Sequence, residues 1–347
     1  MIGLALSGGG VKGSYQVGAY LAFKRCNIKI DMITGTSIGS LNGAMIASGN
    51  FSKLLRFWLK ADVGKFLGAS KKLAYKINKN IKDEEYYKLS FDNIINIVKN
   101  GGIEIKAMQD ALGKYNVEDK LRKSKILFGL STLRLKDLKP LDLFIEDIPL
   151  GKLDNYIIAS CYIPVFKKEK LDSDSFFFDG GIYNNCPYNM LIEKGCNKVY
   201  AIDLGAIGIK QVPKKGAEII KIKPSRKISG MLSLNKKEIR KNIYLGYFDT
   251  LKVLKNYDGH KYIFKKLPNE YYEKLLSNIN PKILKKASDF LGTSIYKELV
   301  ILAVETEMLR KKEKYFKVYN IKKIIRRYQR CKNDSFIGHF INSLQLT

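Results

Sequence analysis

A serine between two glycines is the residue of this sequence whose setting best suits chemistry. Ser37 lies in the pentapeptide GTSIG, which follows an apolar run and precedes a helix-forming segment. A G-x-S-x-G pentapeptide in that setting is typical of a nucleophile on a sharp turn, where Gly35 and Gly39 leave room for the neighbouring strand and helix. The spacing therefore predicts that Ser37 is a nucleophile.

A serine nucleophile needs a base to accept its proton. The histidines, His260 and His339, stand outside any motif in the C-terminal third of the chain. A better candidate is Asp179 of FFFDGG, which ends an apolar run and is followed by Gly180 and Gly181. Burial would raise the pKa of this carboxyl group and make it a stronger proton acceptor. We therefore predict a serine–aspartate dyad that requires no metal and no cofactor.

The glycine-rich stretch SGGGVKG is predicted to stabilise the negative charge that forms during ester attack. It lies between an apolar run and a helix-forming segment, so its backbone N–H groups are expected at the N-terminus of a helix. Such groups are typical donors of an oxyanion hole. We expect Gly8, Gly9, Gly10 and Gly13 to form it, with Lys12 adding positive potential or orienting the loop.

Two other functions also fit parts of the sequence. Gly8, Gly10 and Gly13 match the G-x-G-x-x-G fingerprint of dinucleotide-binding proteins, and Asp31 stands where a ribose-binding carboxylate is expected. An oxidoreductase that binds NAD or FAD is therefore one alternative. The net charge of +29 fits a nucleic-acid-binding protein, although no recognised nucleic-acid-binding motif is visible.

Composition limits the class of protein further. The 347 residues are 46% apolar and 11% aromatic, which predicts a folded chain with a sizeable core. No apolar run reaches membrane-spanning length, and the first residues carry no secretory signal. Five cysteines without C-x-x-C spacing fit a reducing compartment without structural zinc. We expect a cytoplasmic protein, with peripheral membrane contact as an open option.

The order of elements predicts a three-layer α/β fold with a mostly parallel sheet. Strand, glycine turn and helix occur twice within the first fifty residues, which is typical of doubly wound sheets. The pattern places strands at 2–6, 28–34, 124–133, 141–147, 175–178, 199–205 and 219–224, and helices at 14–23, 40–49 and 153–163, the last ending before Pro164. We expect a catalytic domain at 1–226, with a helical insertion or lid at 51–123 and a loop near 99–102, and a helical part at 227–347.

The C-terminal part contains a strongly basic segment. Residues 310–332 hold eleven lysines and arginines and one acid, and Val318, Ile321, Ile324 and Ile325 fall at helical spacing. This pattern predicts a basic amphipathic helix. Its apolar stripe could face an anionic membrane surface or pack on the catalytic domain.

The three motifs together resemble the patatin-like phospholipase family. GGGVKG is similar to the anion loop of that family, GTSIG to its nucleophile motif and DGG to its aspartate motif, in the same order along the chain. ASCYIPVF and DGGIYNNCPYNML extend the similarity, which spans roughly residues 2 to 255. The resemblance implies an α/β fold, Ser37 as nucleophile, Asp179 as base, no metal, and a lipid ester as substrate.

Overall fold

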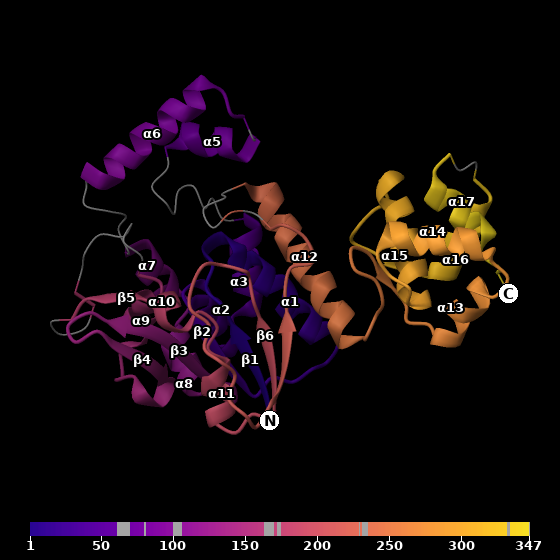
Figure 1. The fold of residues 1–347 in the computed structure, drawn as a ribbon. Coiled ribbons are helices and arrows are strands. Elements are labelled where there is room, and N and C mark those ends of the chain that lie inside the picture. Colours follow the sequence, from indigo (N-terminus) through magenta and orange to yellow (C-terminus); the bar gives the residue numbers. More distant parts are fainter. Residues whose placement is uncertain are drawn as a thin grey trace. The chain divides into compact units, whose positions relative to one another are not determined.

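The structure of the chain is a computed structural model (Figure 1). It describes residues 1–60, 70–79, 81–99, 106–162, 170–171, 175–228, 230, 235–331 and 334–346. The chain divides into two compact units, Met1–Asp249 and Thr250–Thr347. The sequence had placed this boundary after residue 226.

A mixed sheet of seven strands, as far as the described residues go, forms the centre of the first unit. The strands are β1 (Ile2–Leu6), β2 (Met32–Thr36), β3 (Leu127–Arg134), β4 (Lys139–Phe144), β5 (Phe177–Asp179), β6 (Lys198–Ile202) and β7 (Glu218–Ile222). They lie in the order β4-β3-β2-β1-β6-β7, and β5 also pairs with β3. The pairs among β3, β2, β1, β6 and β7 are parallel, whereas β4 and β5 run antiparallel to β3.

Helices cover both faces of this sheet, which confirms the predicted three-layer α/β fold. On one face, α2 (Ile38–Ala47) packs its Gly43 against Leu6, Ile33 and Phe128. On the other face, α11 (Tyr188–Glu193) packs its Leu191 in a buried cluster with residues of β1, β2 and β6. Alternation of side chains along each strand directs these two sets of apolar residues to opposite layers.

The remaining helices of the first unit connect and flank the strands (Figure 1). They are η1 (Gly10–Gly13), α1 (Ser14–Arg25), α3 (Phe51–Lys60), α5 (Lys71–Lys79), α6 (Glu84–Lys99), α7 (Lys106–Lys114), α8 (Val117–Arg122), η2 (Ile145–Asp147), α9 (Leu153–Ser160), α10 (Gly181–Asn184) and α12 (Lys236–Leu254). The insertion predicted at 51–123 is thus helical where it is described. The loop predicted near 99–102 falls largely outside the described residues. The helix predicted to begin at Leu153 and to end before Pro164 ends earlier, at Ser160.

Helix α12 packs closely on α1 at two glycines, one in each helix. A Cβ added at Gly18 of α1 would lie 1.8 Å from the Ile243 carbonyl oxygen, and one added at Gly246 would lie 2.0 Å from the Tyr15 carbonyl oxygen. The two helix backbones are therefore in direct contact. Tyr15 also donates a 2.9 Å hydrogen bond to the buried carboxylate of Asp249. These contacts explain why the unit continues past residue 226.

The second unit is built mainly from helices. It contains α13 (Asn269–Leu276), α14 (Pro281–Leu291), α15 (Tyr296–Arg310), α16 (Ile321–Gln329) and α17 (Phe336–Ser343), with a small parallel pair of β8 (Ile263–Phe264) and β9 (Val318–Tyr319). Buried aromatic and aliphatic side chains from these elements form its own core. Among the described residues, no helix combines the length and apolar character needed to cross a bilayer.

The basic segment 310–332 differs from the single amphipathic helix that the sequence predicted. Helix α15 ends at Arg310, Val318 lies in β9, and α16 begins only at Ile321. The apolar side chains Ile321, Ile324 and Ile325 are buried in the core of the second unit. The apolar stripe therefore belongs to the interior of this unit, and its cations lie on the outer side.

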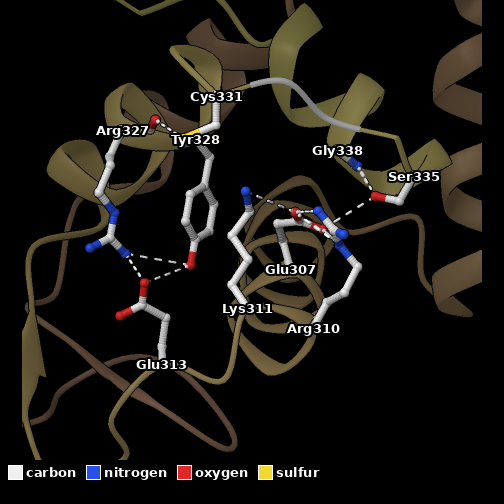
Figure 2. Close-up of polar contacts among 9 residues, drawn as sticks. All are labelled: Glu307, Arg310, Lys311, Glu313, Arg327, Tyr328, Cys331, Ser335 and Gly338. Atoms are coloured by element: carbon white, nitrogen blue, oxygen red, sulfur yellow. Dashed lines mark hydrogen bonds and ion pairs between the residues drawn. The ribbon is translucent and has the colours of Figure 1, made fainter.

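Several cations of this segment form internal ion pairs (Figure 2). Glu307, whose side chain is almost fully buried, accepts hydrogen bonds from Arg310 and Ser335 and lies 3.7 Å from the Lys311 ammonium. The hydrogen bonds from Arg310 lower the pKa of Glu307. Arg327 pairs with Glu313 in the same way. Part of the basic character of 310–332 thus stabilises the fold of the second unit.

Candidate active site

Ser37 sits on a strained turn between β2 and α2. Its φ and ψ are 55° and −130°, a backbone conformation that is costly for a residue with a Cβ. A Cβ added at Gly35 would lie 2.3 Å from the Gly39 carbonyl oxygen, and one added at Gly39 would lie 2.2 Å from the Leu6 carbonyl oxygen. The two glycines therefore allow the sharp turn that the sequence predicted at this position.

Strand β3 brings Ser37 and Asp179 together. The last residue of β2, Thr36, pairs with Ser131 of β3, and the last residue of β5, Asp179, pairs with Thr132. Strand β2 runs parallel to β3 and β5 runs antiparallel to it. The last residues of β2 and β5 therefore pair with neighbouring residues of β3. Ser37 follows Thr36 directly, so the hydroxyl and the carboxylate face each other at this junction.

The carboxyl group of Asp179 is buried and linked to the serine. It accepts a 2.7 Å hydrogen bond from the Gly181 N–H, and the Ser37 side chain lies close enough to affect its pKa. Burial raises the pKa of Asp179, and the Ser37 side chain and the Gly181 N–H only partly offset the rise. Gly180 is required beside it, because an added Cβ would lie 2.1 Å from the Ser131 carbonyl oxygen. The environment thus favours a carboxylate of increased basicity.

Ser160 at the end of α9 fixes the junction and was not identified from the sequence. Its hydroxyl accepts a 2.9 Å hydrogen bond from the Ser37 N–H and donates a 2.7 Å hydrogen bond to the Ser131 carbonyl oxygen. Its own carbonyl oxygen accepts a bond from the Gly180 N–H. Ser160 therefore connects the backbone of the nucleophile turn to that of the aspartate turn. The only sequence signal for it is its place in ASCYIPVF.

The glycine loop lies next to the nucleophile, at the end of β1. A Cβ added at Gly8 would lie 3.2 Å from the Ser37 Cβ and 2.5 Å from the Asn185 Oδ1. The Gly8 N–H donates a 3.0 Å hydrogen bond to the Asn185 carbonyl oxygen. By contrast, within the described part of the chain, no acceptor contacts the N–H groups of Gly9 and Gly10. These two glycines hold the available donors.

The other two residues predicted for the loop have different surroundings. Gly13 packs against α2, since an added Cβ would lie 2.6 Å from the Ile38 side chain, and its carbonyl oxygen accepts a 3.0 Å hydrogen bond from Asn42. Lys12 lines an open cleft together with Leu204 and Gly205.

Asp31 lies at the wrong edge of the sheet for the dinucleotide interpretation. It immediately precedes β2, and its carboxylate accepts a 2.7 Å hydrogen bond from the N–H of Ile2, the first residue of β1. The glycine loop follows the last residue of β1. Five residues of strand separate the two sites, roughly 16 Å. Asp31 therefore cannot hold the ribose of a nucleotide bound at the glycine loop.

The α/β sheet therefore holds a strained serine turn, a buried aspartate and a glycine loop close to one another. The family model described as patatin-like phospholipase matches residues 4–192, which is more than half of the chain. The chain belongs to the patatin-like phospholipase family. The family resemblance predicted from the three motifs is thereby confirmed.

Two of the relatives that the chain matches are named as lysophospholipases. The chain is similar to lysophospholipase nte1 of Aspergillus terreus, with 28% identity over 210 residues that cover 59% of this chain and 12% of that protein. It is also similar to lysophospholipase NTE1 of Candida glabrata, with 26% identity over 219 residues, 62% of this chain and 11% of that protein. The chain thus spans only a small part of the length of these relatives.

Among solved structures, VipD from Legionella pneumophila aligns with 98% of this chain and 84% of its own. The identity is 13% and the TM-score is 0.43.

Proposed function

We propose that the chain hydrolyses carboxylic esters of lipids with Ser37 as nucleophile and Asp179 as general base. The observation that carries this proposal is the meeting of β2 and β5 on β3, which places a strained serine beside a buried carboxylate of raised pKa. The first unit contains no histidine, so a serine–histidine pair is not available there. Membership of the phospholipase family supports a lipid ester as the substrate.

The proposed reaction proceeds through an acyl-enzyme. The Ser37 oxygen attacks the ester carbonyl carbon while its proton passes to Asp179. The bond to the leaving alcohol then breaks, and Asp179 returns the proton to that alcohol. A water molecule next gives a proton to Asp179 and attacks the acyl group, which leaves as a carboxylic acid, and the proton returns to Ser37.

The oxyanion formed in each attack is assigned to Gly9 and Gly10. Gly8, which was also expected to contribute, already donates its N–H to Asn185. Gly9 has φ 156° and Gly10 has φ 58°, backbone conformations that favour glycine. Each such donor is typically worth about 100-fold to 1000-fold in kcat.

Covalent labelling tests this assignment. A fluorophosphonate should add to the wild-type chain, and the intact mass should show one adduct. Ser37→Ala should abolish the adduct, and Asp179→Asn should slow its formation by about 100-fold or more. Ser48→Ala is the matched control, because Ser48 is a buried serine at the far end of α2. Equal labelling of wild type and Ser37→Ala would refute the proposal.

Peripheral contact with an anionic membrane is proposed as an electrostatic interaction only. The apolar residues of α16 are buried, so lipid contact falls to exposed cations of the second unit such as Lys323 and Arg326. Sedimentation of the full chain with anionic vesicles, compared with neutral vesicles, measures this contact. An equal bound fraction with both vesicles would exclude it.

A further inference from the structure

A buried asparagine beside the glycine loop, Asn185, has no part in the reaction proposed for Ser37 and Asp179. It follows α10 directly, and only 2% of its surface is exposed. Among the residues that the structure describes, its amide Nδ2 finds no hydrogen-bond acceptor. A buried donor without a partner is destabilising, so the reason for this side chain must lie in what it contacts.

The amide of Asn185 occupies space that three glycines leave open. A Cβ added at Gly8 would lie 2.5 Å from its Oδ1, and one added at Gly181 would lie 3.1 Å from the same atom. A Cβ added at Gly208 would lie 2.8 Å from both the Cβ and the Cγ of Asn185. A side chain at Gly8 or Gly208 would therefore displace the amide, because packed atoms do not approach so closely.

The same two glycines place the amide beside both proposed catalytic groups. The Cβ added at Gly8 would also lie 3.2 Å from the Ser37 Cβ. The Cβ added at Gly181 would also lie 3.0 Å from the Asp179 Oδ1. A single carbon atom at either glycine would thus touch the amide on one side and a proposed catalytic side chain on the other.

The backbone of Asn185 is fixed by hydrogen bonds on both sides. Its N–H donates to the Ile209 carbonyl oxygen at 2.7 Å, and its carbonyl oxygen accepts from the Gly8 N–H at 3.0 Å. The carbonyl oxygen of the preceding residue, Asn184, accepts a 2.6 Å hydrogen bond from the Thr36 hydroxyl at the end of β2. The Asn185 side chain is therefore held in its place between the glycines.

A shift of either glycine would move a group that the reaction needs. Gly8 is followed by Gly9 and Gly10, to which the oxyanion is assigned. The Gly181 N–H donates to the Asp179 Oδ1 at 2.7 Å, so this carboxylate follows the Gly181 peptide. Catalytic groups must be held within about 0.5 Å of the productive geometry, and a displacement of about 1 Å can cost about 100-fold in rate.

We propose that Asn185 is a positioning residue, whose amide holds the Gly8 and Gly181 peptides apart and so fixes the oxyanion donors and the base relative to Ser37. The inference rests on the proposed function and adds a residue to its site. Asn185 acts by filling space, because its Nδ2 donates to none of the atoms described. The shape of the side chain therefore matters more than its polarity.

Kinetics with p-nitrophenyl butyrate, a soluble ester, tests this role. Asn185→Ala empties the space between the glycines, so kcat should fall about 100-fold. KM should change little, because a positioning residue does not contact the substrate. Asn185→Leu keeps the branching at Cγ and lacks the unpaired donor, so it should restore kcat to within about 10-fold of the wild type.

Asn189→Ala is the matched control. Asn189 is also buried, and its side chain donates to the Val212 carbonyl oxygen and accepts from the Lys214 N–H, each at 2.9 Å. These contacts anchor the loop after β6 rather than the glycine loop. Asn189→Ala should therefore lower the Tm and leave kcat near the wild-type value.

Hydrogen exchange gives a readout that does not depend on the reaction. In Asn185→Ala, exchange should become faster in peptides that cover residues 7–13 and 179–184, because both glycine peptides are released. Asn185→Leu should restore slow exchange, and Asn189→Ala should leave these peptides unchanged. If Asn185→Ala does not fold, the milder truncation Asn185→Ser takes its place under the same criteria.

The outcomes separate the positioning role from the proposed function. An active wild type whose kcat and exchange are unchanged in Asn185→Ala would overturn the positioning role alone. Asn185→Leu as slow as Asn185→Ala, at the Tm of the wild type, would also overturn it, because the amide would then act through its polar atoms. A wild type that neither hydrolyses the ester nor reacts with a fluorophosphonate would refute the acyl hydrolase assignment, and hydrogen exchange would still decide whether Asn185 holds the two glycines.

Discussion

Replacement of Asp179 by asparagine should remove activity and increase stability. The carboxylate is buried, and burial raises its pKa above the ordinary value of aspartate. Above the ordinary pKa, the unfolded chain ionises more readily than the folded chain. The folded state therefore loses stability as the pH rises towards the raised pKa, and the loss persists at neutral pH. Asparagine has the same shape and carries no charge to bury.

The size of both effects follows from the contacts of Asp179. Asparagine keeps an oxygen to accept the Gly181 N–H but cannot accept the Ser37 proton. Loss of a general base lowers kcat by about 100-fold to 10,000-fold. Each pKa unit of upward shift corresponds to about 1.4 kcal/mol, and 1 kcal/mol changes the Tm of a domain of this size by about 2–4 °C. An increase in Tm of a few degrees is expected.

Asp203 provides the opposite case in the same unit. It is also buried, and burial tends to raise its pKa, but Lys210 lowers it below the ordinary value. The ionised Asp203 carboxylate therefore stabilises the fold at pH values above the pKa that it has in the unfolded chain. This stabilisation is lost as the pH falls through the pKa that it has in the folded chain. Asp203→Asn should destabilise the unit by about 1–2 kcal/mol at neutral pH.

Thermal unfolding of wild type, Asp179→Asn and Asp203→Asn between pH 4 and 8 measures both effects. The advantage of Asp179→Asn should shrink at the acid end of this range. As the pH is lowered, kcat/KM of the wild type should begin to fall at a pH above the ordinary pKa of aspartate. A decrease in Tm for Asp179→Asn at neutral pH, of the size seen for Asp203→Asn, would refute the argument from burial.

Three further substitutions test other parts of the structure. Gly246→Ala should destabilise the first unit by about 2 kcal/mol or more in chemical denaturation, because its Cβ would meet backbone, whereas Gly113→Ala, with open space in α7, should be neutral or stabilising. Ser160→Ala should lower kcat by about 10-fold with little change in KM, because the nucleophile turn loses a buried hydrogen bond. A variant that loses its folded circular dichroism spectrum together with its fluorophosphonate labelling would contradict a positioning role for Ser160. Glu307→Gln should lower the Tm of the second unit at pH 7 but much less at pH 3, since its hydrogen bonds with Arg310 depress its pKa; the same loss at both pH values would argue against this ion pair.

The sequence predicts the local parts of the site well. Strand β1 was expected at 2–6 and occupies Ile2–Leu6, because its apolar run is bounded by Met1 and by three glycines. Strand β2 was expected at 28–34 and occupies Met32–Thr36. The error arises because Gly35 reads as a turn residue, whereas it pairs inside the sheet with Leu6 and Leu130.

The parts of the site that depend on distant segments could not be predicted. Strand β5 is short and antiparallel, so a periodic pattern cannot reveal that Asp179 pairs with Thr132. Ser160 is a single serine at a helix end, and its contacts with two turns have no local signature. The basic segment 310–332 was misjudged because helical spacing does not show that Val318 is drawn into a strand pair with Ile263.

The junction on β3 has a consequence for how this protein family can vary. Helices α3 to α8 are inserted between β2 and β3, and none of the residues at the junction comes from them. An insertion, deletion or exchange within that segment leaves the pairing of Thr36 and Asp179 with β3 unchanged. Changes in these helices can therefore remodel the surface beside the sheet while the spacing of Ser37 and Asp179 stays constant.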